Sequence, residues 1–206
     1  MNSQRVSPED LKEWGLVTTS PKSAEIFCGI WNTLETNFKA PSAIVSKFWD
    51  QMRSGEIDNN TRGIIFEILI GFLMLRQGIA PLYRQAELSY VNNARFDLLL
   101  WEDGQYPIAL SLKTSLRERY KQAILESDAL KSVHRTAITF VVTLDKTEVE
   151  VRKKKEKSRD QSSSLDGFLL ATDPEFDALL SDLARRNYRP PADINPMKRG
   201  SRASIS

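Results

Sequence analysis

The stretch RFDLLLWEDGQYPIALSLK, residues 95–113, consists of two apolar runs separated by the turn-forming tetrapeptide EDGQ at residues 102–105. An Asp-Gly pair between two such runs is a strong signal for a β-hairpin. We therefore expect residues 95–101 and 106–113 to form two paired strands. The second strand ends in charged residues and leads directly into a charged segment, so its end is a candidate site.

Three polar side chains interrupt the apolar runs of this hairpin. Asp97 follows Phe96 and precedes three leucines. If it is buried, its carboxylate needs a cation or a metal ion nearby, whereas at a strand edge it could face solvent. Both interpretations stay open on sequence grounds. Ser111 and Lys113 are two residues apart, so their side chains should lie on the same face of the second strand.

Further secondary-structure signals lie on both sides of the hairpin. An apolar helix at about residues 58–77 and a strand at residues 82–90 are expected before it. A helix that begins after Ser115 and a strand rich in β-branched residues at residues 137–144 are expected after it. The order is helix, strand, strand, strand, helix, strand. It predicts an α/β fold in which helices flank a mixed β-sheet.

The remaining segments are expected to add to this core. Two helices near residues 23–37 and 42–53 precede it. Residues 149–164 are highly charged and then rich in serine, which is typical of an exposed ribbon or loop. A short strand at residues 167–171 and a helix at residues 174–185 follow.

The overall composition narrows the class of protein. The chain has 206 residues, of which 41% are hydrophobic, and this suffices for one domain with a real core. We expect a single domain over residues 1–188 and a disordered basic tail over residues 189–206. The formal net charge of +2 does not by itself indicate a polyanionic partner.

Two further features favour the cytoplasm. The single cysteine, Cys28, excludes an internal disulfide framework, and no secretory signal is visible at the start of the sequence. The most apolar window, residues 64–75, is too short to span a bilayer and contains Glu67.

Glu67 in this window could form a structural ion pair with Arg62 or Arg84, or it could belong to a functional site.

Ser111-Leu112-Lys113 and the string KTSLRERYKQ at residues 113–122, followed by Glu126-Ser127, resemble a known family. They are similar to the PD-(D/E)xK nuclease superfamily, in the branch of type II restriction endonucleases that cut CCNGG, CCWGG or CCGG sites. In that branch the second acid of the motif is replaced, often by serine, and a carboxylate from the following helix takes its place. Here Tyr120 stands where the family usually has tryptophan, and Phe96 replaces the proline of the family name.

The resemblance covers residues 62–130 and implies a restriction-endonuclease-like catalytic core at about residues 62–145. Glu67, Asp97, Lys113 and Glu126 occur in family order. By resemblance, Asp97 and Glu126 would coordinate Mg²⁺, and Lys113 would orient or activate the attacking water. Glu67 would act through water or a second metal ion, and Ser111 would be a polar neighbour rather than a nucleophile.

The resemblance also implies how DNA would be recognised. Arg117, Glu118 and Arg119 would read C:G pairs of double-stranded DNA, because arginine can bind guanine and glutamate can accept from cytosine. Taken without the family, such alternating charges are more typical of a solvated helix face. A palindromic site implies a homodimer, and a restriction enzyme implies a cognate DNA methyltransferase in the same system.

Several alternatives remain beside this interpretation. The chain could be a DNA repair or nicking endonuclease of the same superfamily, a catalytically silent DNA-binding module, or an α/β interaction domain. The basic cluster at residues 152–159 could contact phosphates or could be a solvated loop. Trp31 and Trp49 are expected in the core rather than in base stacking, and His134 is expected at a helix end rather than in catalysis.

Overall fold

The computed structural model describes residues 5–18, 21–34, 40–53, 55–92, 94–116, 119–157, 164–191 and 197–205. Its helices are α1 (Pro8–Glu13), α2 (Pro21–Trp31), α3 (Pro41–Arg53), α4 (Asn59–Arg76), α5 (Arg119–Val133), α6 (Lys146–Lys157) and α7 (Pro174–Leu183). Its strands are β1 (Leu82–Leu88), β2 (Phe96–Glu102), β3 (Tyr106–Lys113), β4 (Ile138–Thr143), β5 (Gly167–Leu170) and β6 (Met197–Ala203). The order α4, β1, β2, β3, α5, β4 confirms the predicted α/β fold with a mixed sheet flanked by helices.

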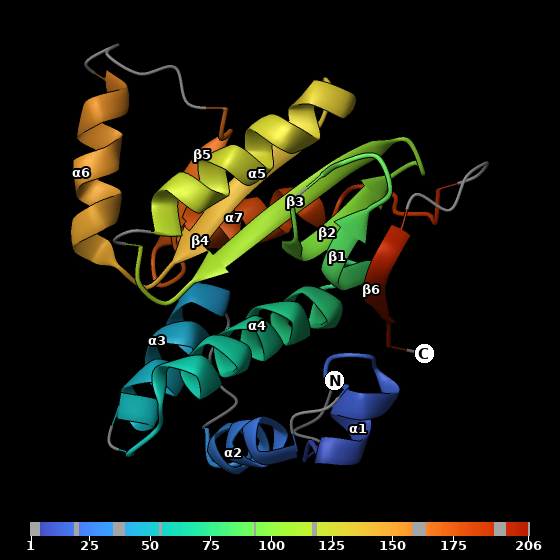
Figure 1. Ribbon diagram of the computed structural model, residues 1–206. Coiled ribbons are helices and arrows are strands. Elements are labelled where there is room, and N and C mark those ends of the chain that lie inside the picture. The colour runs from blue at the N-terminus through green and yellow to red at the C-terminus, as the bar shows by residue number, and fades with distance from the viewer. Residues whose placement is uncertain are drawn as a thin grey trace.

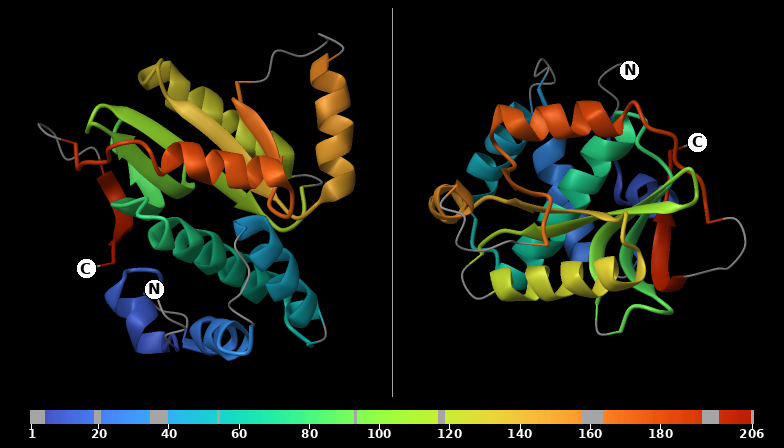
Figure 2. Two further views of the ribbon diagram at one scale, coloured as in Figure 1. Left: turned by 180° about the vertical axis from the view of Figure 1, so that it is seen from behind. Right: turned by 90° about the horizontal axis from the view of Figure 1, so that it is seen from above.

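The strands form one sheet in the order β5-β4-β3-β2-β1-β6. The β1–β2, β2–β3 and β1–β6 pairs are antiparallel, whereas β3–β4 and β4–β5 are parallel. Helix α5 covers one face, and α4 and α7 lie on the other (Figures 1 and 2). The predicted hairpin is confirmed, and it forms the centre of the sheet.

Side-chain alternation in the hairpin divides the core into two parts. Leu98, Leu100, Ile108, Leu110 and Leu112 pack in the larger apolar cluster, which contains the buried face of α4. The intervening Leu99, Trp101 and Ala109 pack in a second cluster with Leu130 of α5. This alternation follows from strand geometry. It directs Ser111 and Lys113, which have the same parity as Ala109, toward the α5 side.

The long helix α4 is held by its amino-terminal cap and by its apolar surface. Asp58 caps it and accepts a 2.9 Å hydrogen bond from the Thr61 amide. Apolar residues cover most of its faces, and eleven of its residues are buried. Such a helix must lie inside the molecule, as predicted. None of the helices in the described part of the chain is long and apolar enough to cross a membrane.

The sequence-based expectation for residues 149–164 is wrong in its first half, because residues up to 157 belong to α6. Charged side chains of α6 form ion pairs within the helix and with α7. Arg152 lies 3.4 Å from Glu148, one helical turn earlier, and Lys153 pairs with Glu175 of α7. Val149 anchors the helix in a small apolar cluster. Val149 and the ion pair with α7 thus dock a helix that looked like a loop in sequence. Residues 158–163 lie outside the described residues.

The expectation of a disordered tail is wrong for residues 197–203. They form β6, which pairs with β1 from Leu82↔Ala203 to Leu88↔Met197. The reason is that backbone groups, rather than apolar side chains, hold this strand: β1 would otherwise be an edge with unpaired donors and acceptors. The loop after α1 adds a further contact, in which the Ser204 amide donates to the Trp14 carbonyl at 3.1 Å.

Candidate active site

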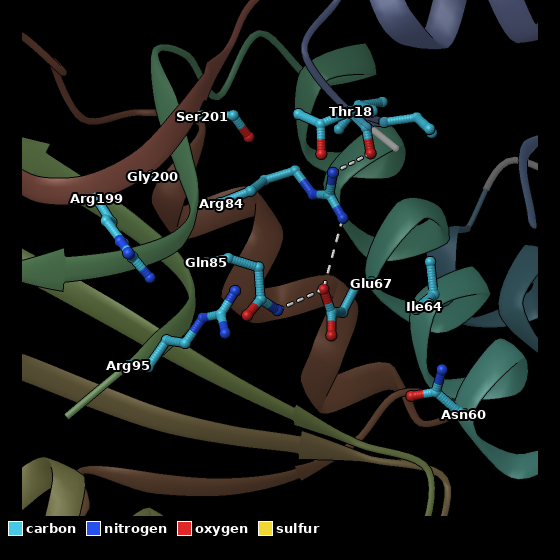
Figure 3. A pocket seen from close by; sticks show the side chains of 12 residues that line it. Thr18, Asn60, Ile64, Glu67, Arg84, Gln85, Arg95, Arg199, Gly200 and Ser201 are labelled. Atoms are coloured by element: carbon cyan, nitrogen blue, oxygen red, sulfur yellow. Dashed lines mark hydrogen bonds and ion pairs between the residues drawn. The ribbon is translucent and has the colours of Figure 1, made fainter. Parts of the chain in front are cut away.

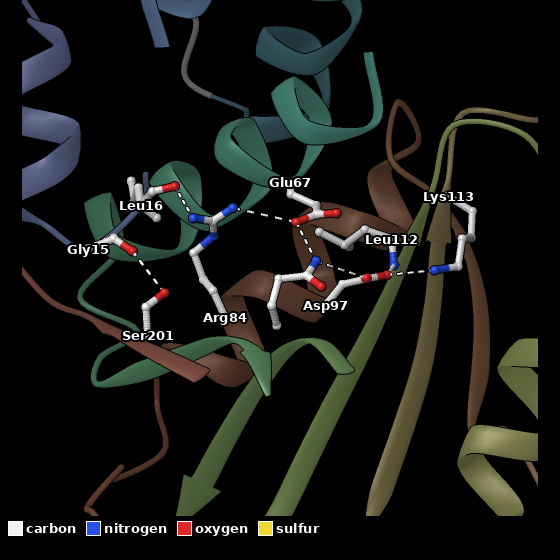
Figure 4. Close-up of polar contacts among 9 residues, drawn as sticks. Gly15, Leu16, Glu67, Arg84, Asp97, Leu112, Lys113 and Ser201 are labelled. Carbon is white, nitrogen blue, oxygen red and sulfur yellow. Dashed lines mark hydrogen bonds and ion pairs between the residues drawn. The ribbon is translucent and has the colours of Figure 1, made fainter. Parts of the chain in front are cut away.

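The end of the hairpin brings Asp97 and Lys113 together. Asp97 lies near the start of β2 and Lys113 at the end of β3, and antiparallel pairing places these two ends side by side. The Lys113 Nζ donates to Asp97 Oδ2 at 2.8 Å, and the Leu112 amide donates to the same oxygen at 2.7 Å (Figure 4). Their side chains are only 9% and 10% exposed. Asp97 is therefore buried and compensated by a cation, which decides between the two interpretations left open by the sequence.

Glu67 of α4 is connected to Asp97 through Gln85 of β1. The Gln85 Nε2 donates to Glu67 Oε2 at 2.7 Å and lies 3.3 Å from Asp97 Oδ1. Arg84 also contacts Glu67, at 3.5 Å, so the structural pairing considered from sequence is present with Arg84. Arg62 instead donates to a backbone carbonyl. Glu67 thus has a structural partner and a polar connection to the candidate site at the same time.

Gln85 was missed by sequence reasoning, and an irregularity in β1 explains its role. In a regular strand Leu82 and Ala86 would share one face, yet Leu82 packs under α4 and Ala86 packs in the opposite cluster. The change of face occurs at Gln85, whose φ is 49°. Because of it, the consecutive side chains of Arg84 and Gln85 both reach Glu67 (Figure 4). A bulge of this kind redirects a side chain toward a site.

Glu126 reaches the same region from α5. It is 6% exposed and accepts a 2.8 Å hydrogen bond from Gln122, one helical turn earlier. Burial raises the pKa of Glu126, the negative charge of Asp97 raises it further, and the charge of Lys113 lowers it. The Glu126 carboxylate therefore lies within electrostatic range of the Asp97–Lys113 pair.

Glu67 carries a similar perturbation. Burial raises the pKa of the Glu67 carboxyl, and the nearby charge of Asp97 raises it further, against the effects of Gln85, Arg84 and Lys113. Asp97 of β2 contacts Lys113, and the charge of this lysine also acts on Glu67 of α4 and Glu126 of α5. Burial disfavours the ionised forms of Glu67 and Glu126, and further positive charge nearby would offset this effect.

The donor chemistry of this region suits a hard divalent cation. Mg²⁺ prefers oxygen ligands and is usually bound by one or two carboxylates together with water and substrate phosphate. Among the described residues, Asp97 Oδ1 accepts one hydrogen bond, the 3.3 Å contact from Gln85, and Glu126 is the nearby acid on α5. No group of three or more His, Cys, Asp or Glu side chains is arranged to hold a metal among the described residues. Asp97 and Glu126 are the acids of this region that could contribute metal ligands, and water and substrate would have to supply the others.

The other sequence candidates fall into three groups. Ser111 Oγ is buried and has no hydrogen-bond partner among the described residues, and it stays a predicted polar neighbour. Arg119 is exposed at the start of α5, whereas Arg117 and Glu118 lie outside the described residues. The basic helix α6 is fixed to α5, because Arg152 lies 3.8 Å from the ring centroid of Tyr120.

Trp31, Trp49 and His134 have the structural surroundings predicted from the sequence. Trp31 and Trp49 are 6% and 8% exposed and belong to the large apolar cluster. His134 follows the last residue of α5 and packs edge-on against Trp101 at 5.4 Å. It lies on the side chain of a core residue rather than among the clustered acids.

Comparison with known proteins yields one structural likeness. No protein-family model matches the chain, and no curated protein matches its sequence. A solved structure does resemble it. This structure is the restriction endonuclease PspGI in complex with substrate DNA, and the superposition covers 87% of this chain and 92% of that chain with a TM-score of 0.46 and 11% sequence identity. Residue roles cannot be transferred at this identity, so they rest on the geometry and motifs of this chain.

Proposed function

We propose that the protein is a Mg²⁺-dependent site-specific endonuclease that hydrolyses phosphodiester bonds of double-stranded DNA. Its target would be a short palindromic sequence with C:G pairs, of the CCNGG, CCWGG or CCGG type. The observation that carries the proposal is the buried 2.8 Å ion pair between Asp97 of β2 and Lys113 of β3, with Glu126 of α5 within electrostatic range of both. These are the residues that the motif resemblance nominates. The hairpin accounts for the closeness of Asp97 and Lys113, but the approach of Glu126 depends on the packing of α5.

The side chains suit the chemistry of phosphodiester hydrolysis. Lys113 has three N–H donors, of which one is used by Asp97, so the others remain for a water molecule or a phosphate oxygen. The fixed ammonium group would orient the attacking water and offset charge that develops on the phosphate. Asp97 and Glu126 would hold a Mg²⁺ ion, which would polarise the phosphate and favour ionisation of a bound water.

Recognition and assembly follow from the same proposal. Arg117, Glu118 and Arg119 directly precede or begin α5, the helix that carries Glu126. A shift of α5 on binding of DNA bases to these residues would therefore also shift the Glu126 carboxylate. A palindromic target calls for a homodimer in which each subunit cuts one strand, and host protection calls for a cognate DNA methyltransferase.

The first experiment incubates the protein with unmethylated phage DNA and Mg²⁺ and then sequences the ends of any fragments. We expect discrete fragments whose ends share a short C:G-containing palindrome, and no cleavage in EDTA. Smeared products or single-strand nicks would favour a repair or nicking endonuclease instead. Intact DNA with retained binding would indicate a DNA-binding module without catalytic activity.

Variants then test the residue assignment. Lys113→Ala and Glu126→Gln should abolish cleavage while DNA binding, measured by fluorescence anisotropy in EDTA, stays within a few-fold of the original protein. The matched control is Lys12→Ala, which removes an exposed lysine from α1. Full activity of either Lys113→Ala or Glu126→Gln would refute the assignment.

A further inference from the structure

A pocket of about 560 Å³ adjoins the candidate active site. It lies between the β1–β6 edge of the sheet, the first half of α4 and the loop after α1 (Figure 3). Glu67 and Gln85 line it, and the same two side chains form the polar connection to Asp97. One side chain, that of Gln85, thus separates the pocket from the proposed catalytic group.

The pocket has an excess of positive charge. Arg84, Arg95 and Arg199 line it, and Glu67 is the acid among the described residues that line it. Arg84 is engaged already: it is 6% exposed, donates to the Leu16 carbonyl and pairs with Glu67. Its charge therefore serves mainly to hold Glu67 and the loop after α1 in place.

Arg95 and Arg199 differ from Arg84. Both side chains are exposed, and neither guanidinium forms a hydrogen bond or an ion pair with any described residue. In the view of Figure 3 the side chains of Arg95 and Arg199 both point toward the pocket that Gln85 and Glu67 also line. They come from the segment before β2 and from β6, which are about a hundred residues apart in sequence. The sheet topology, rather than a local charge run, brings these two cations to one cavity.

Two guanidinium groups facing one cavity are suited to a phosphate. Arginine presents planar N–H donors that match phosphate oxygens, and charge-assisted bonds of this type are the stronger ones. Thr18 also lines the pocket, and its hydroxyl could donate to the same group, whereas the Ser201 hydroxyl donates to the Gly15 carbonyl.

We propose that Arg95 and Arg199 bind a phosphodiester group of the cleaved DNA strand, next to the scissile one. This inference rests on the proposed function. A DNA strand carries one phosphate per nucleotide, so a strand that places its scissile phosphate at Lys113 also brings its neighbouring phosphates past the adjoining surface. The pocket is larger than a phosphate group, and its apolar residues Leu16, Val17 and Ile64 leave room for the attached deoxyribose.

The first test measures the salt dependence of DNA binding for Arg95→Ala and Arg199→Ala. The probe is a short duplex that carries the site mapped by the cleavage assay, in EDTA. Loss of one phosphate contact lowers the slope of log affinity against log salt by about 0.9. The original protein should therefore bind better than either variant at low salt, and this advantage should shrink about threefold between about 50 and 200 mM salt.

Two further variants separate charge from folding. Arg95→Lys retains the positive charge and should keep most of the salt slope. Arg53→Ala, which removes an exposed arginine from the end of α3, should bind with the same slope as the original protein. Equal thermal midpoints for all variants, measured by circular dichroism, exclude unfolding as the cause of a change.

The second test identifies the phosphate. Duplexes with a single uncharged methylphosphonate at each position of the cleaved strand are bound to the original protein, Arg95→Ala and Arg199→Ala. At one position next to the scissile bond the methylphosphonate should weaken the original protein more than either variant, because each variant has already lost one of the two contacts to that phosphate. A partner position on the uncut strand, or equal losses for all proteins at every position, would overturn the inference.

The two proposals fail in distinguishable ways. If the original protein does not cut DNA, the proposed function fails, and the assignment of the pocket to a cleaved strand fails with it. If it cuts DNA while Arg95→Ala and Arg199→Ala match Arg53→Ala in both tests, only the pocket inference fails.

Discussion

Replacing Lys113 by methionine removes the cation that compensates Asp97 while it keeps a long side chain at the end of β3. Both side chains of the pair are about one tenth exposed, so water cannot solvate the remaining carboxylate well. Loss of one partner from a buried ion pair costs about 3–5 kcal/mol of unfolding free energy. Asp97 keeps the 2.7 Å hydrogen bond from the Leu112 amide, and this favours the lower end of that range.

We therefore expect Lys113→Met to lower the free energy of unfolding by about 3 kcal/mol. For a domain of this size, this loss corresponds to a thermal midpoint lower by roughly 6–12 °C. The measurement is guanidinium denaturation followed by circular dichroism, with EDTA present so that bound metal does not contribute. Thermal melts in the same buffer provide an independent value.

The double variant Asp97→Asn/Lys113→Met is the decisive control. It removes both charges, while the asparagine can still accept from the Leu112 amide. It should be more stable than Lys113→Met alone, because no uncompensated charge is left in the core. A cost below about 1 kcal/mol for Lys113→Met, or a double variant as unstable as the sum of the two single changes, would refute this reasoning.

Three other predictions concern stability and accessibility. Burial and the nearby negative charges of acidic residues raise the pKa of the Cys28 thiol to about 11. At pH 8 the folded protein should therefore contain about a hundredfold less Cys28 thiolate than an ordinary thiol would, and it should react slowly with iodoacetamide. Rapid alkylation of the folded protein would contradict this prediction. Gly15→Ala should lower the unfolding free energy by more than about 1 kcal/mol, because φ is +73° and the new Cβ would lie 2.1 Å from the Arg202 carbonyl oxygen; an unchanged denaturation midpoint would disprove it. Tyr120→Ala removes the ring that the Arg152 guanidinium contacts, so it should speed tryptic cleavage within α6. Tyr120→Phe retains the ring and should not change the rate. Equal cleavage rates for the two variants would argue against the stacking contact.

The hairpin and the order of elements could be predicted because their signals are local. An Asp-Gly turn between two apolar runs fixes the pairing of β2 and β3 within a few residues, and that pairing brings Asp97 close to Lys113. The electrostatic coupling of Glu126 to this pair depends on how α5 packs, and the contribution of Glu126 could only be inferred by resemblance.

The features that sequence did not predict depend on long-range pairing. Gln85 has no motif around it, and its position depends on a positive φ in the middle of β1, a conformation that most side chains avoid. Helix α6 has only weak amphipathic character, so its docking through Val149 is hidden among charges. Arg95 and Arg199 line one pocket because β6 pairs with the edge strand β1, and no local sequence pattern predicts this pairing.

The return of β6 to the sheet has a practical consequence for preparing the protein. Residues after about 190 look dispensable from their composition, yet removing them would uncover the backbone groups of β1 along its outer edge. An uncovered edge of this kind offers a template for strands of other molecules and favours aggregation. Residues 197–203 thus cover the outer edge of β1, so a purification tag should not be introduced in exchange for this segment.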